Sequence, residues 1–377
     1  MSGARSLLAA AVLGFAALLP LSVGQASPAL EYMVLAEAYV VMALGLNVVV
    51  GFAGLLDLGY VAFYAIGAYA VGWFASDFFS YINKEKGVHV GVTGQPASLP
   101  GIHVNFILLI IAAMVLAAAA GAVIGLPTLR LRGDYIAIVT LAFGEIAGTI
   151  ALNGDAIHIG KYHLTEGQTA ISPVDQPQLP GLDQFNSAFS LRGYYWLGLA
   201  MAVIVLLVNL SLRDSRLGRA WIAIREDEVA AASMGVPLVR TKLLAYAIGA
   251  ALGGAAGAFL GAYTNSINSN QFQFAFSIFV LAMVILGGLG SIWGTVLGAI
   301  VLAVTDRYLI PDVFDKFDIQ GKLGLDFAFT DLSFGIFGFL LVIMMVLRPQ
   351  GLFPERRRKM ELTESLGSDE ALYEVRA

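Results

Sequence analysis

The 377-residue chain contains no cysteine, and only 13% of its residues are charged. The missing cysteine excludes disulfides, thiol catalysis and cysteine-ligated metals. The charge is also unevenly spread, because three long stretches hold no Asp, Glu, Lys or Arg: Ser6–Leu30, Gly87–Leu129 and the 63 residues of Leu243–Thr305. A soluble domain usually has about 25% charged residues, and about 20 apolar residues suffice to cross a bilayer. The sequence therefore predicts a multi-pass membrane protein.

Two further absences argue against an ATP site and a metal site in this chain. No G-x-x-x-x-G-K-S/T motif occurs, so the chain is not expected to bind ATP itself. His158 and His163 are five residues apart, which misses the spacing of a helical metal pair, and all four histidines are interpreted as surface residues between spans or at a span entrance. No catalytic site, metal site or cofactor is predicted for this chain, and no nucleic-acid partner is expected.

The apolar runs predict an all-α fold. They are continuous rather than alternating, and lipid requires each spanning segment to satisfy its own backbone groups, which favours helices over barrel strands. We predict about ten transmembrane helices, at residues 6–23, 29–50, 58–76, 104–125, 134–153, 193–212, 243–263, 275–290, 292–309 and 332–348. Residues 1–354 form this transmembrane domain, and the charged residues 355–377 form a cytoplasmic tail. A cleaved signal peptide is an alternative for the first helix.

The basic residues predict the orientation. An even number of spans places both termini on one side. If that side is the cytoplasm, 15 of the 22 Lys and Arg residues fall in cytoplasmic segments. Because cytoplasmic loops carry an excess of Lys and Arg, both termini are predicted to be cytoplasmic, and so is the loop 213–242 between the sixth and seventh helices.

That loop contains a segment with helical periodicity. In Leu217–Gly235, the residues Leu217, Trp221, Ile224 and Glu228 share one helical face, while Gly235 and Pro237 supply stop signals. The pattern predicts one short helix at the membrane surface, with a charged patch facing the cytosol that comprises Arg225, Glu226, Asp227 and Glu228. Such a helix suits docking into a cleft on another protein. A solvated connector helix is the alternative.

Several motifs point to one family. Glu228, Ala230, Ala231 and Gly235 resemble the E-A-A-x-x-x-G loop of ABC-importer permeases. Further motifs are GLLDLGYVAFYAIGAY at 54–69, LPTLRLRGDYIAIVTLAFGE at 126–145, GRAWIAIREDE at 218–228, ILGGLGS at 285–291 and RPQGLFP at 348–354. Together, over residues 38–354, they resemble the LivM-type permeases of branched-chain amino-acid ABC importers.

The resemblance implies a fold, a function and partners. The fold would be of the vitamin-B12-importer type (type II), and the chain would move leucine, isoleucine or valine across the inner membrane. Two cytosolic ATPases would supply ATP and Mg²⁺ chemistry, beside a sister H-type permease and a periplasmic or lipid-anchored solute-binding protein. ATPase coupling would fall on Trp221, Arg225, Glu226, Asp227, Glu228, Ala231 and Gly235. Other amino acids, amides or urea are alternative solutes, and an ATP-independent secondary transporter is an alternative function.

Two features inside the spans complete the predictions. Gly249, Gly253, Gly257 and Gly261 recur every four residues, a spacing at which two helix backbones can approach closely, so they are predicted to pack helices, with gating as the alternative. Glu145 falls within the fifth span, where a charge is costly and faces protein or water. It either lines a translocation path or has a structural role.

Overall fold

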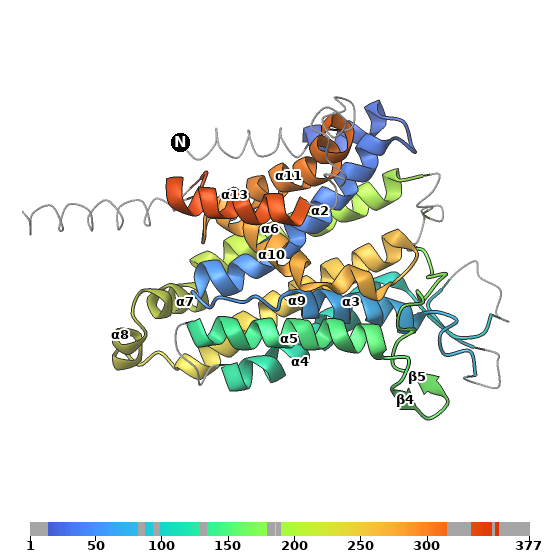
Figure 1. The fold of residues 1–377 in the computed structure, drawn as a ribbon, viewed down its shortest axis with the longest axis horizontal. Helices are drawn as coiled ribbons and strands as arrows, with labels where there is room; N and C mark the ends of the chain where they lie inside the picture. The colour runs from blue at the N-terminus through green and yellow to red at the C-terminus, as the bar shows by residue number, and fades with distance from the viewer. Residues whose placement is uncertain are drawn as a thin grey trace, which may run out of the picture.

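The computed structural model describes residues 14–81, 87–92, 99–128, 134–178, 185, 190–314, 333–348 and 351–353. These residues are mainly helical (Figure 1). The helices are α2 (Pro28–Leu46), α3 (Val61–Phe74), α4 (Phe106–Thr128), α5 (Asp134–Asn153), α6 (Arg192–Asp214), α7 (Arg216–Glu226), α8 (Glu228–Ser233), α9 (Leu238–Thr264), α10 (Phe274–Gly287), α11 (Ile292–Val304) and α13 (Ser333–Leu347). Residues 14–22 are also helical. Two π-helical segments, η1 (Asn47–Phe52) and η4 (Thr305–Phe314), continue α2 and α11, and a 3₁₀ turn, η3 (Ser269–Phe272), precedes α10.

The prediction of a helical multi-pass membrane protein is confirmed. Within the described residues, six helices are long enough and apolar enough to cross a membrane: 28–52, 106–128, 135–153, 192–214, 238–264 and 292–309. Every predicted span overlaps described helical residues, although 6–13 of the first span and the tail 355–377 lie outside the described part of the chain. The count of ten spans and the type II fold stay predictions.

α9 is the centre of the bundle. It packs against α2, α3 and α4, and small residues let the backbones approach. At Gly249, an added Cβ would lie 3.0 Å from the Gly45 carbonyl oxygen of α2. The Tyr60 hydroxyl donates to the Gly249 carbonyl oxygen at 2.9 Å, so the start of α3 is tied to the middle of α9.

α3 is too short to cross a membrane alone. Its 14 residues rise about 21 Å, whereas the hydrocarbon core is about 30 Å thick. Residues 54–60 form a non-helical connection that we call the strap. The predicted helix 58–76 is wrong at its start, because α3 begins only at Val61. Two N–H groups of the strap are satisfied by side chains: Leu58 N–H donates to Thr140 Oγ1 of α5 at 3.0 Å, and Gly59 N–H donates to Asp57 Oδ1 at 2.9 Å.

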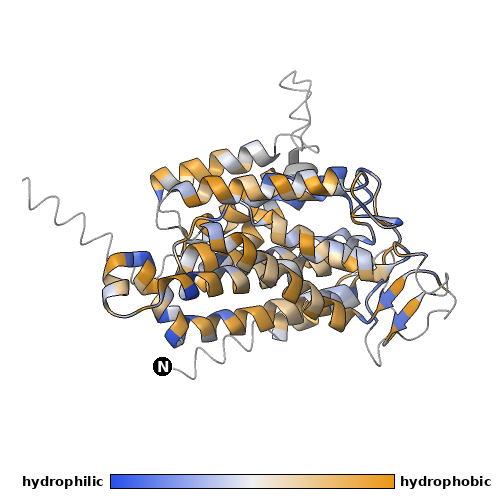
Figure 2. Cartoon of the chain, turned by 90° about the horizontal axis from the view of Figure 1, so that it is seen from below, coloured by the Kyte–Doolittle hydropathy of each residue, from blue (hydrophilic) through white to orange (hydrophobic). Residues whose placement is uncertain are grey.

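The bundle has two different ends. α7 and α8 lie at one end, and the short strands lie at the other (Figure 1). Hydrophilic residues gather at these ends, while the helices between them are largely hydrophobic (Figure 2). The strands are β1 (Ala75–Ser76), β2 (Val88–Val90), β3 (Ile102–Val104), β4 (His158–Ile159) and β5 (Tyr162–His163), in the orders β1-β3-β2 and β4-β5. β1 and β3 pair antiparallel, and β2 and β3 pair parallel.

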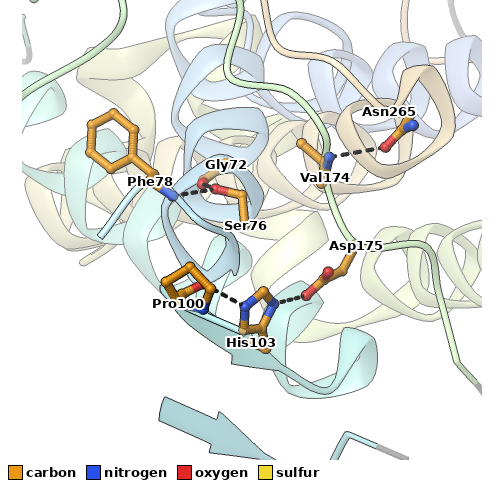
Figure 3. A network of polar contacts seen from close by, with 8 residues as sticks. All are labelled: Gly72, Ser76, Phe78, Pro100, His103, Val174, Asp175 and Asn265. Atoms are coloured by element: carbon orange, nitrogen blue, oxygen red, sulfur yellow. Dashed lines mark hydrogen bonds and ion pairs between the residues drawn. The ribbon is translucent and has the colours of Figure 1, made fainter. Parts of the chain in front are cut away.

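A polar network stabilises the strand end of the bundle. It includes His103, which was predicted to be a surface residue, and that prediction is wrong. His103 is 4% exposed. Its Nδ1 lies 2.6 Å from Asp175 Oδ2 and its Nε2 lies 3.0 Å from the Pro100 carbonyl oxygen (Figure 3). Val174, the residue before Asp175, donates its N–H to Asn265 Oδ1 at the end of α9 at 2.9 Å. The network therefore joins β3 and the segment around Asp175 to the end of the central helix.

Candidate functional site

The predicted surface helix is two helices. Ser215 caps α7 by accepting from Gly218 N–H at 3.1 Å. Asp227 then leaves the helical conformation, with φ −152° and ψ 110°, and its carboxylate accepts from Val229 and Ala230 N–H at 2.8 and 2.9 Å. The prediction of one continuous helix over Leu217–Gly235 is therefore wrong, because Asp227 caps a new helix instead of continuing the first.

Gly235 ends α8. Its φ of +86° lies in the left-handed region, which glycine adopts at little cost. Gly235 N–H donates to the Ala232 carbonyl oxygen at 2.9 Å, and Val236 N–H donates to the Ala231 carbonyl oxygen at 3.1 Å. This is the Schellman pattern, so the stop signal at Gly235 falls where the sequence predicts it.

One face of α7 is anchored in the bundle. Trp221 is fully buried, and Ile224 on the same face is 5% exposed. The Trp221 indole Nε1–H donates to the Thr241 carbonyl oxygen at the start of α9 at 2.7 Å. Ala231 of α8 is buried as well. The apolar face thus holds the α7–α8 unit against α9.

The four charges predicted to face the cytosol have different surroundings. Glu226 and Asp227 are exposed. Arg225 instead turns inward, where its guanidinium donates to the Gly51 carbonyl oxygen at 2.7 Å, so the prediction that it faces the cytosol is wrong. A Cβ added at Gly54 would touch the same arginine. α7 therefore contacts the junction of α2 and the strap.

Glu228 forms an ion pair with Lys242. The carboxylate Oε1 lies 2.7 Å from Nζ, and the side chains are 41% and 3% exposed. Lys242 belongs to the first turns of α9, so the pair fixes α8 to that helix. Sequence reasoning did not identify Lys242 as this partner. The available signal was its place as the last charge before the long apolar run of α9.

The outward side of α8 is apolar. Val229 is 70% exposed and Met234 is 86% exposed, and Val239 just beyond them is also exposed. Val229 and Met234 form an apolar knob that is exposed, whereas Trp221 and Ala231 of the same unit are buried. Such an arrangement can dock another protein, with the exposed charges of Glu226 and Asp227 near this apolar knob in the chain.

The four predicted packing glycines are all buried in α9. An added Cβ at Gly253 would lie 3.0 Å from the Tyr60 ring, and one at Gly257 would collide with the Tyr64 carbonyl oxygen. At Gly261 the nearest atom, Ala68 Cα, is 3.4 Å away. Gly253, Gly257 and Gly261 therefore face α3 or the residue before it, whereas Gly249 faces α2 and η1.

Glu145 lines a cavity of about 440 Å³ between α5 and the η3–α10 turn. The cavity wall comprises Glu145, Gly148, Thr149, Leu152, Ser269, Asn270, Phe272, Gln273, Phe274 and Ala275. Glu145 is exposed, on a stripe of α5 that also exposes Tyr135, Ile138 and Thr149. We call this space the α5 cavity. Sequence reasoning missed the η3 residues because they lie outside any span pattern.

A second cavity of about 230 Å³ shares Asn270 and Gln273 with the first. It is lined by Arg307, a basic residue within the apolar stretch 292–309. Arg307 Nε lies 3.2 Å from Asp306 Oδ2, and its NH2 donates to the Tyr39 hydroxyl at 3.4 Å. The arginine is therefore already compensated by its own neighbours.

Comparisons with known proteins agree with this architecture. The family described as "Branched-chain amino acid transport system / permease component" matches residues 29–345. The chain is 38% identical over 351 residues to the high-affinity branched-chain amino acid transport system permease protein LivM of Escherichia coli K12, covering 88% of this chain and 71% of that protein.

LivM of Salmonella typhimurium is also 38% identical, over 86% of this chain and 69% of its own. The permease protein LivH of the same organism is 25% identical, over 72% of this chain and 82% of its own. No solved structure matches the chain.

Proposed function

This chain belongs to the family of branched-chain amino acid transport permeases, and from that membership we propose that it is the membrane-spanning subunit of an ABC importer for leucine, isoleucine and valine in the inner membrane. Its relatives of both the LivM and the LivH kind are named as permease proteins of branched-chain amino acid transport systems. We therefore propose a sister permease of the H type as its partner in the membrane, and cytosolic ATPases and a solute-binding protein as the other components.

The α7–α8 unit is the proposed ATPase-coupling surface, and it is the observation that supports the importer most directly. Val229 and Met234 offer an apolar knob to a cleft, while Trp221, Arg225 and Glu228 tie the unit to α9 and to the junction of α2 and the strap. A displacement of the knob is thereby passed to the helices of the bundle. In this way, ATP bound to the partner ATPases can drive movement in this chain, which has no nucleotide-binding motif of its own.

The orientation follows from the same surface. The α7–α8 end carries Arg213, Arg216, Arg219, Arg225, Arg240 and Lys242. Because positive residues concentrate on the cytoplasmic side, we place this end in the cytoplasm and the strand end on the outside, with both termini cytoplasmic. We also propose that the α5 cavity lies on the translocation path of the solute, with Glu145 in its wall.

Purification in mild detergent tests the assembly. The tagged chain is expected to retain ATPase subunits, a second polytopic permease and, after addition, a solute-binding protein, as identified by mass spectrometry. Uptake of labelled leucine into proteoliposomes should then require ATP on the ATPase side. A chain that purifies as a homo-oligomer and transports leucine without ATP contradicts the proposal and favours a secondary transporter.

A matched pair of variants tests the surface. Met234→Glu places a charge on the apolar knob and should lower retention of the ATPases about tenfold or more, since removing a central apolar anchor from an interface costs 2 kcal/mol or more. Val90→Glu, at an exposed valine of β2 on the strand end, is the control and should retain them. Equal retention in both variants would place the ATPase contact elsewhere.

A further inference from the structure

The α5 cavity has opposite polarity on its two walls. On one wall, the Glu145 carboxylate makes no hydrogen bond or ion pair with any described residue and is exposed to the cavity. On the other wall, Phe274 and Ala275 are the first residues of α10. The first N–H groups of a helix have no partner within it, and the helix dipole adds partial positive charge there.

The start of α10 is not capped by its own sequence. The residue before it, Gln273, makes no side-chain capping hydrogen bond. Ser269, which lines the same cavity and is 5% exposed, has a hydroxyl with no hydrogen-bond partner among the described residues. A buried hydroxyl without a partner is costly, and a bound solute would satisfy it.

The lining also includes the polar residues Thr149, Asn270 and Gln273, and it has an apolar part. Leu152, Phe272 and Phe274 stand beside the polar groups. A cavity of about 440 Å³ falls within the range of small-molecule sites. A solute that fits these walls has a cation, an anion and a small aliphatic part close together.

We propose that the α5 cavity binds a free α-amino acid with an aliphatic side chain, whose ammonium group pairs with Glu145 and whose carboxylate accepts N–H groups at the start of α10. The choice of solute rests on the proposed function, whereas the two opposed walls are independent of it. The site lies in this subunit, so recognition of the solute does not end with the binding protein.

Thiol protection tests occupancy. The chain has no cysteine, so Thr149→Cys introduces its single thiol inside the cavity and Tyr81→Cys introduces one at an exposed position outside it. Each variant is purified with its partner subunits and treated with a membrane-impermeant thiol reagent. Saturating leucine should slow labelling of Thr149→Cys at least about fivefold and leave Tyr81→Cys unchanged. Equal labelling with and without leucine overturns the site.

Analogues and Glu145→Gln test the pairing. In the Thr149→Cys background, 4-methylpentanoate, which is leucine without its amine, should protect only at a concentration about tenfold higher than leucine, as expected for loss of one charge-assisted hydrogen bond. With Glu145→Gln added, leucine should lose that advantage and the two compounds should protect equally. Glu31→Gln, at an exposed carboxylate outside the cavity, is the control. Unchanged discrimination in Glu145→Gln overturns the ammonium assignment.

The two proposals fail in different ways. Protection by leucine in a chain that retains no ATPases would contradict the importer and keep the cavity site. Leucine uptake that needs ATP, together with a cavity thiol that leucine never protects, would keep the importer and overturn the site.

Discussion

The Glu228–Lys242 pair gives an asymmetric prediction. Breaking a fully buried pair by removing one partner costs about 3–5 kcal/mol, and an exposed pair contributes about 0–1 kcal/mol. Lys242 is 3% exposed and Glu228 is 41% exposed. Glu228→Gln leaves a buried ammonium without its carboxylate, so we expect the α8–α9 contact to lose about 2 kcal/mol. Lys242→Met leaves a carboxylate that water can reach, and keeps the apolar stem, so we expect a loss of about 0.5–1 kcal/mol.

Hydrogen exchange measures this contact directly. The amides of Gly235 and Val236 donate to carbonyl oxygens of α8, and they exchange when α8 opens. A loss of 2 kcal/mol corresponds to exchange about thirtyfold faster, because 1.4 kcal/mol is a factor of ten. Lys242→Met should accelerate exchange by about two- to fivefold, and the double variant should behave like Lys242→Met, since no unpaired buried charge remains.

The order of the two single variants is the decisive result. If Lys242→Met accelerates exchange more than Glu228→Gln does, the buried ammonium is not the source of the cost. The pair would then act through the packing of the lysine stem.

Further predictions concern the bundle, the cap and the strand end. Gly257→Ala should lower thermal stability in detergent strongly, because the Cβ meets backbone, whereas Gly261→Ala, with its nearest atom at 3.4 Å, should shift the melting temperature little. Asp227→Ala removes the α8 cap and should cost about 1 kcal/mol, seen as faster amide exchange over 228–234 with α7 unchanged. His103→Ala removes the contact with Asp175 and should make residues 99–105 more sensitive to proteolysis, while ATPase retention stays at the level of the unmodified chain.

The spans were predictable because hydropathy reports burial in lipid. The predicted span 134–153 coincides with α5, and 193–212 lies inside α6. The strap was not predictable, since Leu55, Leu58 and Tyr60 have the same apolar character as the helix that follows. What makes those residues non-helical is a set of distant partners, Thr140 and Gly249, which hydropathy does not contain.

The candidate site was predictable in position and not in detail. The stop at Gly235 is a local property of glycine, and the sequence locates it. The break at Asp227 depends on a balance between helix propensity and capping, and the contacts of Trp221 and Glu228 with α9 on either side of it are not visible in a local pattern. The α5 cavity depends on where η3 lies against α5, and no local pattern reports that contact.

The strap limits which parts of the bundle can slide past one another. In the middle of a membrane, a non-helical backbone is tolerated only where protein covers it. Leu58 N–H uses a hydroxyl of α5, and Val61 N–H uses the Ser277 hydroxyl of α10 at 3.0 Å. Separating α5 or α10 from the strap would bare these amides to lipid. The parts of α5 and α10 that hold these two amides are therefore expected to move together with the strap and the start of α3.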